Sequence, residues 1–415
     1  MSRVKIIGIG ACGNKAAIQC LEDGTVIDKD ILLLNSTLKD IPEKYKEYAI
    51  EFGNIKGCGK ERQLAAKMLY DSMGNKEIDI DKYVDPDTKT IIFVTSSEGG
   101  TGSGATLMLA KYCKQVLMIK NIHIFIITGF EDDVRGLKNT VDIFNELSED
   151  YIVEAISNKK FLESGSMTRA EAEALANKEF SQKVSILLGN HIVPSDKNID
   201  DRDLYKLTNT PGYMTVEYYG INKLKAPEDF DAMLEDMVEC SKSLETEVGA
   251  MRIGVIMNIT KKNRAFVDEE FKVLRKAYGN PYEFFTHIQD TGEDEFIHII
   301  VSGMKLPIDY IKKTYDSYKK QMEHIDLNSD KFFSSRDKFD TSLGNKLNFS
   351  MDDVDDFSTP KESVEDIKKA KDSFFNSFST ANKKVKQDKT SNFTNTVTNE
   401  LWNELFERLR KELNN

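Results

Sequence analysis

Short runs of consecutive hydrophobic residues alternate, along the first part of the chain, with segments whose hydrophobic positions recur every three or four residues. Runs with the length and composition of buried strands lie at 4–9, 31–34, 90–95, 122–128 and 151–156. Segments with helical periodicity lie between them, at 14–22, 60–73, 104–118 and 133–147. This alternation predicts an α/β fold, a Rossmann-like parallel sheet with helices on both faces.

The pattern changes in the second part of the chain. A long central helix is predicted at 168–190, where Gly189 and Asn190 mark its end. Strand patterns at 252–260, 282–290 and 295–304, with helical patterns at 228–244 and 308–325, predict a second, smaller α/β domain.

The last 90 or so residues differ from both domains. Residues 326–390 are polar and have no sustained period, which is typical of a flexible linker. Residues 391–415 predict an amphipathic helix, because Leu401, Leu405, Leu409 and Leu413 recur every four residues. The predicted organisation is a first domain at 1–167, the central helix at 168–190, a second domain at 191–325, a linker at 326–390 and a terminal helix at 391–415.

Composition narrows the class of protein. The formal net charge of −12 argues against broad coating of nucleic acid by the whole body, although a basic cluster at 383–389 could contact DNA. Five cysteines without a C-x-x-C spacing indicate reduced thiols and a cytoplasmic location. No signal peptide is expected, and no run approaches the ~20 apolar residues of a membrane-spanning helix, so no membrane partner is expected.

Two glycine-rich loops follow predicted strands. The first, GIGACGNK at 8–15, has the G-x-G-x-x-G spacing of a dinucleotide-binding turn. An NAD site would place an acidic residue at the end of the second strand, but Asn35 stands there. The second, SSEGGTGSG at 96–104, also opens a helix, so two loops and two helix N-termini can surround one polyphosphate. Thr101 and Ser103 add hydroxyl groups.

These two loops resemble those of the tubulin/FtsZ superfamily of GTPases. The resemblance rests on GGTGSG after a hydrophobic strand and on the tubulin-like GACGNK turn. It implies a GTP-binding first domain, GTP and GDP as ligands, and Mg²⁺ held mainly by phosphates and water. One departure is Glu98, which stands where the family has a small residue; we expect its carboxylate to point away from the phosphates.

The resemblance also implies nucleotide-binding residues. The loop KGCGKERQ at 56–63 fits a third glycine-containing loop, and Glu131, Asp132 and Asp133 fit the region of the acidic ribose contacts, with no choice among the three. ISNKK provides Asn158, and LANKEF provides Asn177 for the guanine. The predicted set is Gly10, Ala11, Cys12, Asn14, Asn35, Gly59, Gly99, Gly100, Thr101, Gly102, Ser103, Glu131, Asp133, Asn158 and Asn177.

In this superfamily one subunit binds GTP, and a loop of the next subunit supplies acidic residues that position the attacking water. The family pattern is roughly G-x-x-N-x-D-x-x-[DE], and we match it to GYMTVEYYG at 212–220. Glu217 is then the catalytic residue acting in trans, while Gly220 replaces the second acid. Other sources of an acid are Asp200, Asp201 and Asp203 before this segment, or Glu228, Asp229 and Asp231 after it.

The charged tail with a terminal helix resembles the TubZ branch, the partition tubulins of plasmids and phages. That likeness implies dynamic head-to-tail filaments that segregate DNA, with the tail engaging a DNA-binding adaptor of the TubR type on centromeric DNA. Three alternatives stay open: a cell-division or cell-shape filament of the same superfamily, a filament that does not hydrolyse GTP, and an NAD(P)-dependent oxidoreductase.

Overall fold

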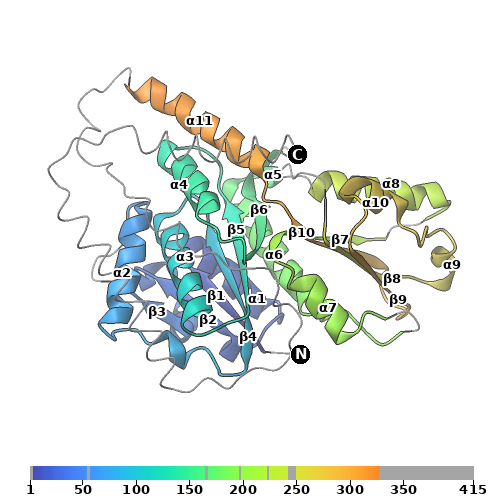
Figure 1. Ribbon diagram of the computed structural model, residues 1–415, viewed down its shortest axis with the longest axis horizontal. Coiled ribbons are helices and arrows are strands. Elements are labelled where there is room, and N and C mark those ends of the chain that lie inside the picture. The colour runs from blue at the N-terminus through green and yellow to red at the C-terminus, as the bar shows by residue number, and fades with distance from the viewer. Residues whose placement is uncertain are drawn as a thin grey trace. The chain divides into compact units, whose positions relative to one another are not determined.

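The computed structural model describes residues 3–53, 57–163, 167–195, 198–221, 224–241 and 249–326 (Figure 1). The predictions for the linker at 326–390, its basic cluster and the helix at 391–415 therefore lie outside the described residues, apart from residue 326. Residues 1–321 form one compact unit. Among the described residues, no helix is both long enough and apolar enough to cross a membrane.

Ten strands form one sheet in the order β3-β2-β1-β4-β5-β6-β7-β10-β8-β9. The strands are β1 (Arg3–Ile9), β2 (Ile31–Asn35), β3 (Ala49–Glu51), β4 (Thr88–Ser96), β5 (Asn121–Thr128), β6 (Ile152–Ser157), β7 (Gly212–Gly220), β8 (Arg252–Asn258), β9 (Glu283–Gln289) and β10 (Phe296–Met304). All neighbouring strands are parallel except at β10, which is antiparallel to both β7 and β8. The predicted α/β fold with a mostly parallel sheet is confirmed.

The main helices are α1 (Gly10–Glu22), α2 (Arg62–Gly74), α3 (Gly100–Gln115), α4 (Val134–Asn145), α5 (Asn158–Glu163), α6 (Arg169–Leu187), α7 (Asp201–Thr208), α8 (Pro227–Ser241), α10 (Lys272–Tyr278) and α11 (Ile308–Asp326). Short turns of helix lie at Asp28–Asp30, Leu38–Asp40, Glu43–Tyr48 and Ile80–Lys82, and α9 spans Lys261–Arg264. Within the residues that the structure describes, each helix and strand predicted from periodicity is present, with shifted ends.

Successive side chains of a strand point to opposite faces, and this alternation divides the helices of the first domain into two groups. One group is α1 and α6, which pack on each other and share a core with Ile6, Ile92 and Phe125. The other group is α2, α3 and α4, which form a second packed row (Figure 1). Both faces of the parallel strands are therefore covered, as their continuous hydrophobic runs require.

The residues at both ends of the central helix α6 explain where it begins and ends. Thr168 and Glu171 form a reciprocal capping box at its N-terminus, which satisfies two backbone N–H groups. Gly189 follows its last turn with φ +70°, a conformation that costs glycine little. In the middle of the helix Phe180 packs edge-to-face on Phe125 of β5, with ring centroids 5.0 Å apart.

The sheet is weakest between β6 and β7. These strands pair only at Ile152 with Gly212 and at Val153 with Tyr213. Beyond that point the backbone N–H of Val216 donates to the side chain of Glu154 at 3.0 Å. A carboxylate thus replaces the missing ladder partner near the predicted boundary between the two domains, whose division stays a prediction.

Candidate functional site

A cavity of about 270 Å³ opens where β1, β2 and β4 end. In an open parallel sheet this carboxyl edge is the usual place for a ligand. Many of the predicted nucleotide-binding residues line the cavity: Gly10, Ala11, Cys12, Asn35, Gly99, Gly100, Thr101 and Gly102. The remaining lining residues were missed from sequence: Ile9, Ser36, Thr37, Asp40, Gly57 and Ser96.

Two helices begin side by side at this cavity. Gly10 starts α1 with φ +77°, and a Cβ there would lie 3.0 Å from the backbone nitrogen of Gly102. A Cβ on Gly102 would lie 2.7 Å from the carbonyl oxygen of Ile9. Both positions therefore need glycine, because the backbones approach too closely for a side chain. The first-turn N–H groups of α1 and α3, which lack partners within their helices, meet at the cavity and can bind an anion.

The hydroxyl groups of the second loop divide into two roles. Thr101 lines the cavity, with its Oγ1 3.1 Å from Oγ of Ser36. Ser103 is fully buried and donates to the carbonyl oxygen of Gly99. The Ser103 hydroxyl donor therefore closes its own loop, and a contact of Ser103 with the ligand stays a prediction.

One carboxylate lines the cavity. It belongs to Asp40, whose Oδ2 accepts a long hydrogen bond from Asn35 Nδ2 at 3.4 Å. Among the described residues, no group of three or more His, Cys, Asp or Glu side chains is arranged to hold a metal ion. Burial raises the pKa of the Cys12 thiol to about 12.

Three amide side chains lie beside the central helix, outside the residues that line the cavity. Asn14, Asn158 and Asn177 are at least nine-tenths buried. Lys15, next to Asn14, pairs with Glu173 of α6, and Lys160, close to Asn158, pairs with Glu179 of α6. Asn177 lies between these two contacts along the helix.

The amide oxygens of Asn14 and Asn158 are buried acceptors that find no hydrogen-bond partner among the described residues. Nδ2 of Asn14 is engaged, since it donates to the carbonyl oxygen of Leu34 at 3.3 Å. Buried acceptors without partners are costly, so these two oxygens are available to a donor on a ligand or an ordered water.

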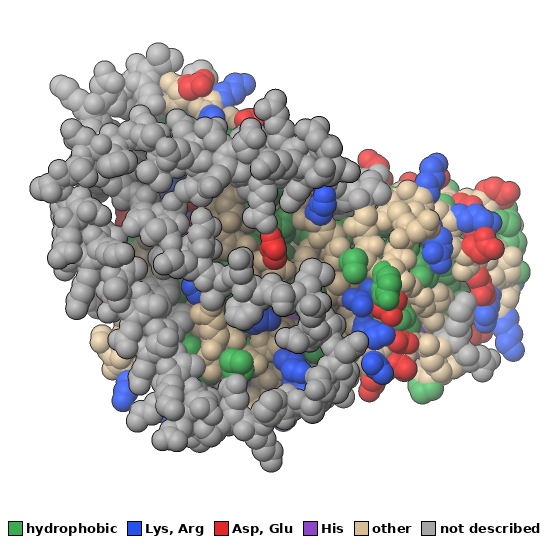
Figure 2. Space-filling model, in the orientation of Figure 1, with side chains coloured by type: hydrophobic (Ala, Val, Ile, Leu, Met, Phe, Trp, Pro, Cys, Tyr) green, Lys and Arg blue, Asp and Glu red, His purple; other side chains and the backbone are tan. Residues whose placement is uncertain are grey.

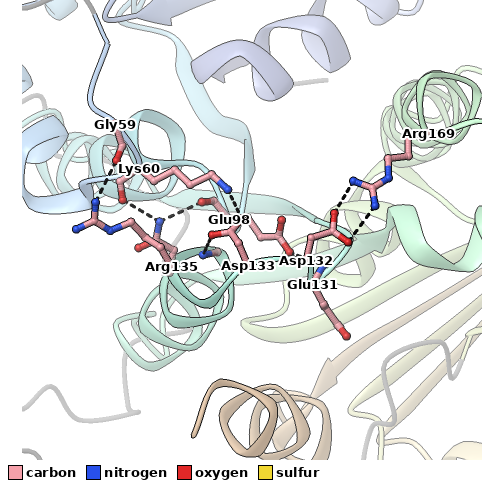
Figure 3. A network of polar contacts seen from close by, with 10 residues as sticks. Gly59, Lys60, Glu98, Glu131, Asp132, Asp133, Arg135 and Arg169 are labelled. Atoms are coloured by element: carbon pink, nitrogen blue, oxygen red, sulfur yellow. Dashed lines mark hydrogen bonds and ion pairs between the residues drawn. The ribbon is translucent and has the colours of Figure 1, made fainter. Parts of the chain in front are cut away.

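The acidic segment 129–136 lies beside the second glycine loop, and Figure 3 shows the cationic partners of Asp132 and Asp133. Glu131 pairs with Lys159 at 3.1 Å, and Asp132 pairs with both terminal nitrogens of Arg169 at 2.5 and 3.0 Å. Asp133 pairs with Lys60 and caps α4 by accepting from Gly136 N at 2.9 Å.

The third glycine-containing loop, predicted at 56–63, also contributes to the cavity. Gly57 lines the cavity, whereas the carbonyl oxygen of Gly59 accepts from Arg135 at 3.3 Å. The loop fits the position predicted for it, but it is Gly57 and not Gly59 that lines the cavity.

The expected catalytic segment is not a loop. Residues 212–220 form β7, and Glu217 lies within that strand with its side chain 15 % exposed. Its Oε1 accepts from Thr215 at 3.0 Å and lies 3.6 Å from Nζ of Lys183. The β-branched and aromatic residues of MTVEYY are typical of a strand and could have indicated this from sequence, while the catalytic role of Glu217 stays a prediction.

The segment that follows the central helix is 188–200, and it leads into α7. Its end, read from Ser195 to Asp203, matches the family pattern at Asn198, Asp200 and Asp203, with serine in place of the glycine. Asp200 caps α7, because its Oδ1 accepts from Asp203 N at 2.8 Å. Burial and the neighbouring Asp200 raise the pKa of Asp203.

Comparisons with known proteins agree with this geometry. No family model matches the chain. The cell division protein FtsZ of Aquifex aeolicus is 25% identical over 321 residues, which cover 74% of this chain and 83% of FtsZ.

The fold is also similar to that of solved structures. The crystal structure of TubZ from Clostridium botulinum phage c-st has a TM-score of 0.61 at 17% identity and covers 78% of this chain and 99% of its own. CetZ2 from Haloferax volcanii, a GTPγS-bound protofilament, has a TM-score of 0.63 at 16% identity, with coverages of 77% and 99%. The chain has the tubulin/FtsZ fold, and the predicted resemblance to that superfamily is confirmed. TubZ and CetZ resemble it about equally, so the fold does not select a branch.

Proposed function

We propose that this chain is a tubulin-like GTPase that binds GTP in the cavity at the carboxyl edge of its sheet and polymerises head to tail. The observation that carries the proposal is the junction of α1 and α3, where Gly10 and Gly102 bring two helix N-termini against one cavity. Backbone N–H groups so arranged are suited to phosphate oxygens. The FtsZ, TubZ and CetZ likenesses support the same ligand.

The buried amides favour guanine over adenine. Guanine carries N–H groups at its N1 and N2 positions, and the unpartnered oxygens of Asn14 and Asn158 can accept from such donors. Adenine has an acceptor at N1 and a donor only at its N6 amino group, so it matches two buried acceptors less well. Asn177, on α6 between them, completes the proposed base site.

Glu131 is the acid best placed for the ribose. Asp133 is occupied by the cap of α4 and by Lys60, and Asp132 is held by two nitrogens of Arg169. Glu131 pairs through one oxygen with Lys159, the neighbour of Asn158. Its other oxygen can accept from a ribose hydroxyl group beside the proposed base site.

Mg²⁺ is the expected companion of a polyphosphate, and Asp40 fits it. A carboxylate that lines a phosphate cavity repels the ligand unless a cation lies between them. Mg²⁺ prefers oxygen ligands and keeps several waters, so Asp40 and the phosphates can share it. When bound, the ion would neutralise charge on the phosphates.

The second half of the active site comes from a neighbouring subunit. We assign the acids to Asp200 and Asp203, which follow the central helix, in place of Glu217, whose side chain is paired with Lys183. A carboxylate there can orient a water molecule for attack on the terminal phosphate.

Exposed hydrophobic residues support the head-to-tail arrangement. Of the seven large exposed ones among the described residues, five precede parallel strands directly or by a few residues: Ile27, Tyr83, Met118, Met251 and Tyr282. They therefore lie toward the amino edge of the sheet, opposite the cavity. Such residues on the face that would meet the next subunit's nucleotide are suited to burial in a filament.

The cellular role proposed is DNA segregation in the cytoplasm, through an adaptor bound by the C-terminal tail. On the face shown in Figure 2, acidic and basic side chains intermingle over the second domain, which favours indirect DNA contact. A division or cell-shape filament is the second candidate, since the FtsZ likeness supports it equally.

Nucleotide selectivity tests the proposal. Equilibrium binding of GTP, ATP and NADH is measured by calorimetry on the full chain with Mg²⁺, and Asn177→Ala is the variant. We expect GTP alone to bind tightly and the variant to lose affinity for it. Tight binding of NADH without GTP would overturn the proposal in favour of an oxidoreductase.

A further inference from the structure

Glu98 stands in the second glycine loop where relatives are expected to have a small residue, and the structure shows where its side chain goes. It points away from the cavity and toward the acidic segment 129–136, as Figure 3 shows. Its Oε1 accepts from the backbone N–H of Glu131 at 2.7 Å. The carboxylate therefore joins the phosphate loop to the segment that carries the proposed ribose contact.

The acidic segment leaves room for this carboxylate. A Cβ on Gly129 would lie 2.0 Å from Oε2 of Glu98, so no other residue fits there without moving the side chain. A Cβ on Gly136 would lie 3.2 Å from the Cβ, Cγ and Cδ atoms of Glu98. Two glycines at the ends of one segment thus enclose the side chain of Glu98.

Asn139 provides a second contact, this time to the backbone of Glu98. Nδ2 of Asn139 donates to the carbonyl oxygens of both Glu98 and Lys60, each at 3.0 Å. Lys60 in turn pairs with Asp133. The three loops that would surround the nucleotide are therefore linked to one another, and Glu98 is bonded through both its side chain and its backbone.

The residue that Glu98 holds is in an uncommon conformation. Glu131 has φ +63°, in the left-handed region that non-glycine residues adopt rarely and at a cost. A hydrogen bond from its N–H to a carboxylate offsets part of this cost, because bonds to charged groups are the stronger ones. Glu98 is half-buried, so water competes weakly for that bond.

We propose that Glu98 is a positioning residue that fixes the backbone of Glu131 so that the Glu131 carboxylate meets the ribose hydroxyls of the bound nucleotide. This inference rests on the proposed function, and it assigns a role to the one position where the phosphate loop departs from its relatives. Removing Glu98 should then weaken ribose recognition and leave the phosphate and base contacts in place.

The test compares GDP with 2′,3′-dideoxy-GDP, which lacks the ribose hydroxyls, by calorimetry on the full chain with Mg²⁺. Wild type should bind GDP about tenfold more tightly than the dideoxy compound, the expected loss of a hydrogen bond to a charged group. Glu98→Ala should lose this preference while its affinity for the dideoxy compound stays at the wild-type value.

Two further variants make the result specific. Glu98→Gln keeps an oxygen that can accept from Glu131 N–H, so it should retain the preference for GDP. Glu77→Ala removes an exposed acid outside these loops and should behave as wild type. If Glu98→Ala binds GDP and the dideoxy compound more weakly by the same factor, or keeps the wild-type preference for GDP, only the role of Glu98 is overturned. Absence of GDP and GTP binding in wild type would overturn the proposed function with it.

Discussion

The side-chain nitrogen of Lys183 on the central helix lies 2.6 Å from Oε1 of Glu154 on β6, and both side chains are almost fully buried. Glu179 and Glu217 approach the same nitrogen at 3.2 and 3.6 Å. The cluster connects β6, α6 and β7 where the strands β6 and β7 part. A buried charge without its partner is strongly destabilising, so these residues depend on one another.

This cluster predicts a particular pH dependence of stability. Burial raises the pKa of Glu154 from 4.5 to about 7, although Lys183 opposes the shift. Between pH 4.5 and about 7, Glu154 is therefore protonated in the folded state and ionised in the unfolded state. The contribution of Glu154 to the free energy of unfolding falls as pH rises through this range.

The comparison is between wild type and Glu154→Gln, unfolded in urea at several pH values from 4.5 to 7.5. The free energy of unfolding of wild type, relative to the variant, should fall as pH rises across that window. A relative rise would show instead that pairing with Lys183 dominates and lowers the pKa of Glu154.

The two assignments of the catalytic acid make opposite predictions. Asp203→Ala should still assemble with GTP, but its phosphate release should fall by about 10²-fold or more, the usual contribution of a positioned acid–base group. Glu217→Ala should mainly lower thermal stability, because it alters the buried cluster around Lys183. If phosphate release stops in Glu217→Ala and persists in Asp203→Ala, the original sequence prediction is the correct one.

Asp40 should make nucleotide binding depend on the divalent cation. In wild type, removal of Mg²⁺ with EDTA should weaken GDP binding, because the carboxylate then faces the phosphates directly. In Asp40→Asn the enhancement by Mg²⁺ should be roughly tenfold smaller, since one repulsive charge is gone. Asp87→Asn, an exposed acid before β4, serves as the control. If Mg²⁺ enhances GDP binding equally in all three proteins, Asp40 does not take part in binding the metal.

The amino edge of the sheet should control assembly without affecting the cavity. Tyr282, 79% exposed, and its neighbour Met251, 46% exposed, are replaced by serine. The critical concentration for assembly with GTP should rise several-fold, since apolar surface no longer becomes buried between subunits, and GDP affinity should be unchanged. Leu175→Ser, an exposed apolar residue on α6, is the control. Normal assembly of the double variant would place the subunit contact elsewhere.

Most of the fold could be predicted because each element carries its own signal. The strands β1, β4 and β5 are continuous hydrophobic runs, and α6 has its capping box and final glycine in the sequence. The same locality explains why several predicted residues do line the cavity, since glycines that open helices can be recognised from a single stretch of residues.

The rest of the site depends on contacts between distant segments. Asp40 lines the cavity because a short helical turn after β2 places it near Thr101, and nothing local indicates this. Ser103 turns inward to bond its own loop. The catalytic pattern was matched to 212–220 by acid spacing alone, and the structure adds that this segment is the strand β7. Which acid is catalytic stays a prediction.

Light scattering and phosphate release, recorded together on the full chain with GTP, with GDP and without nucleotide, test the central claim most directly. The account predicts assembly with GTP alone, accompanied by phosphate release that begins once filaments form. Assembly that ignores the nucleotide, or phosphate release that is equally fast in unassembled protein, would contradict a GTPase completed between subunits.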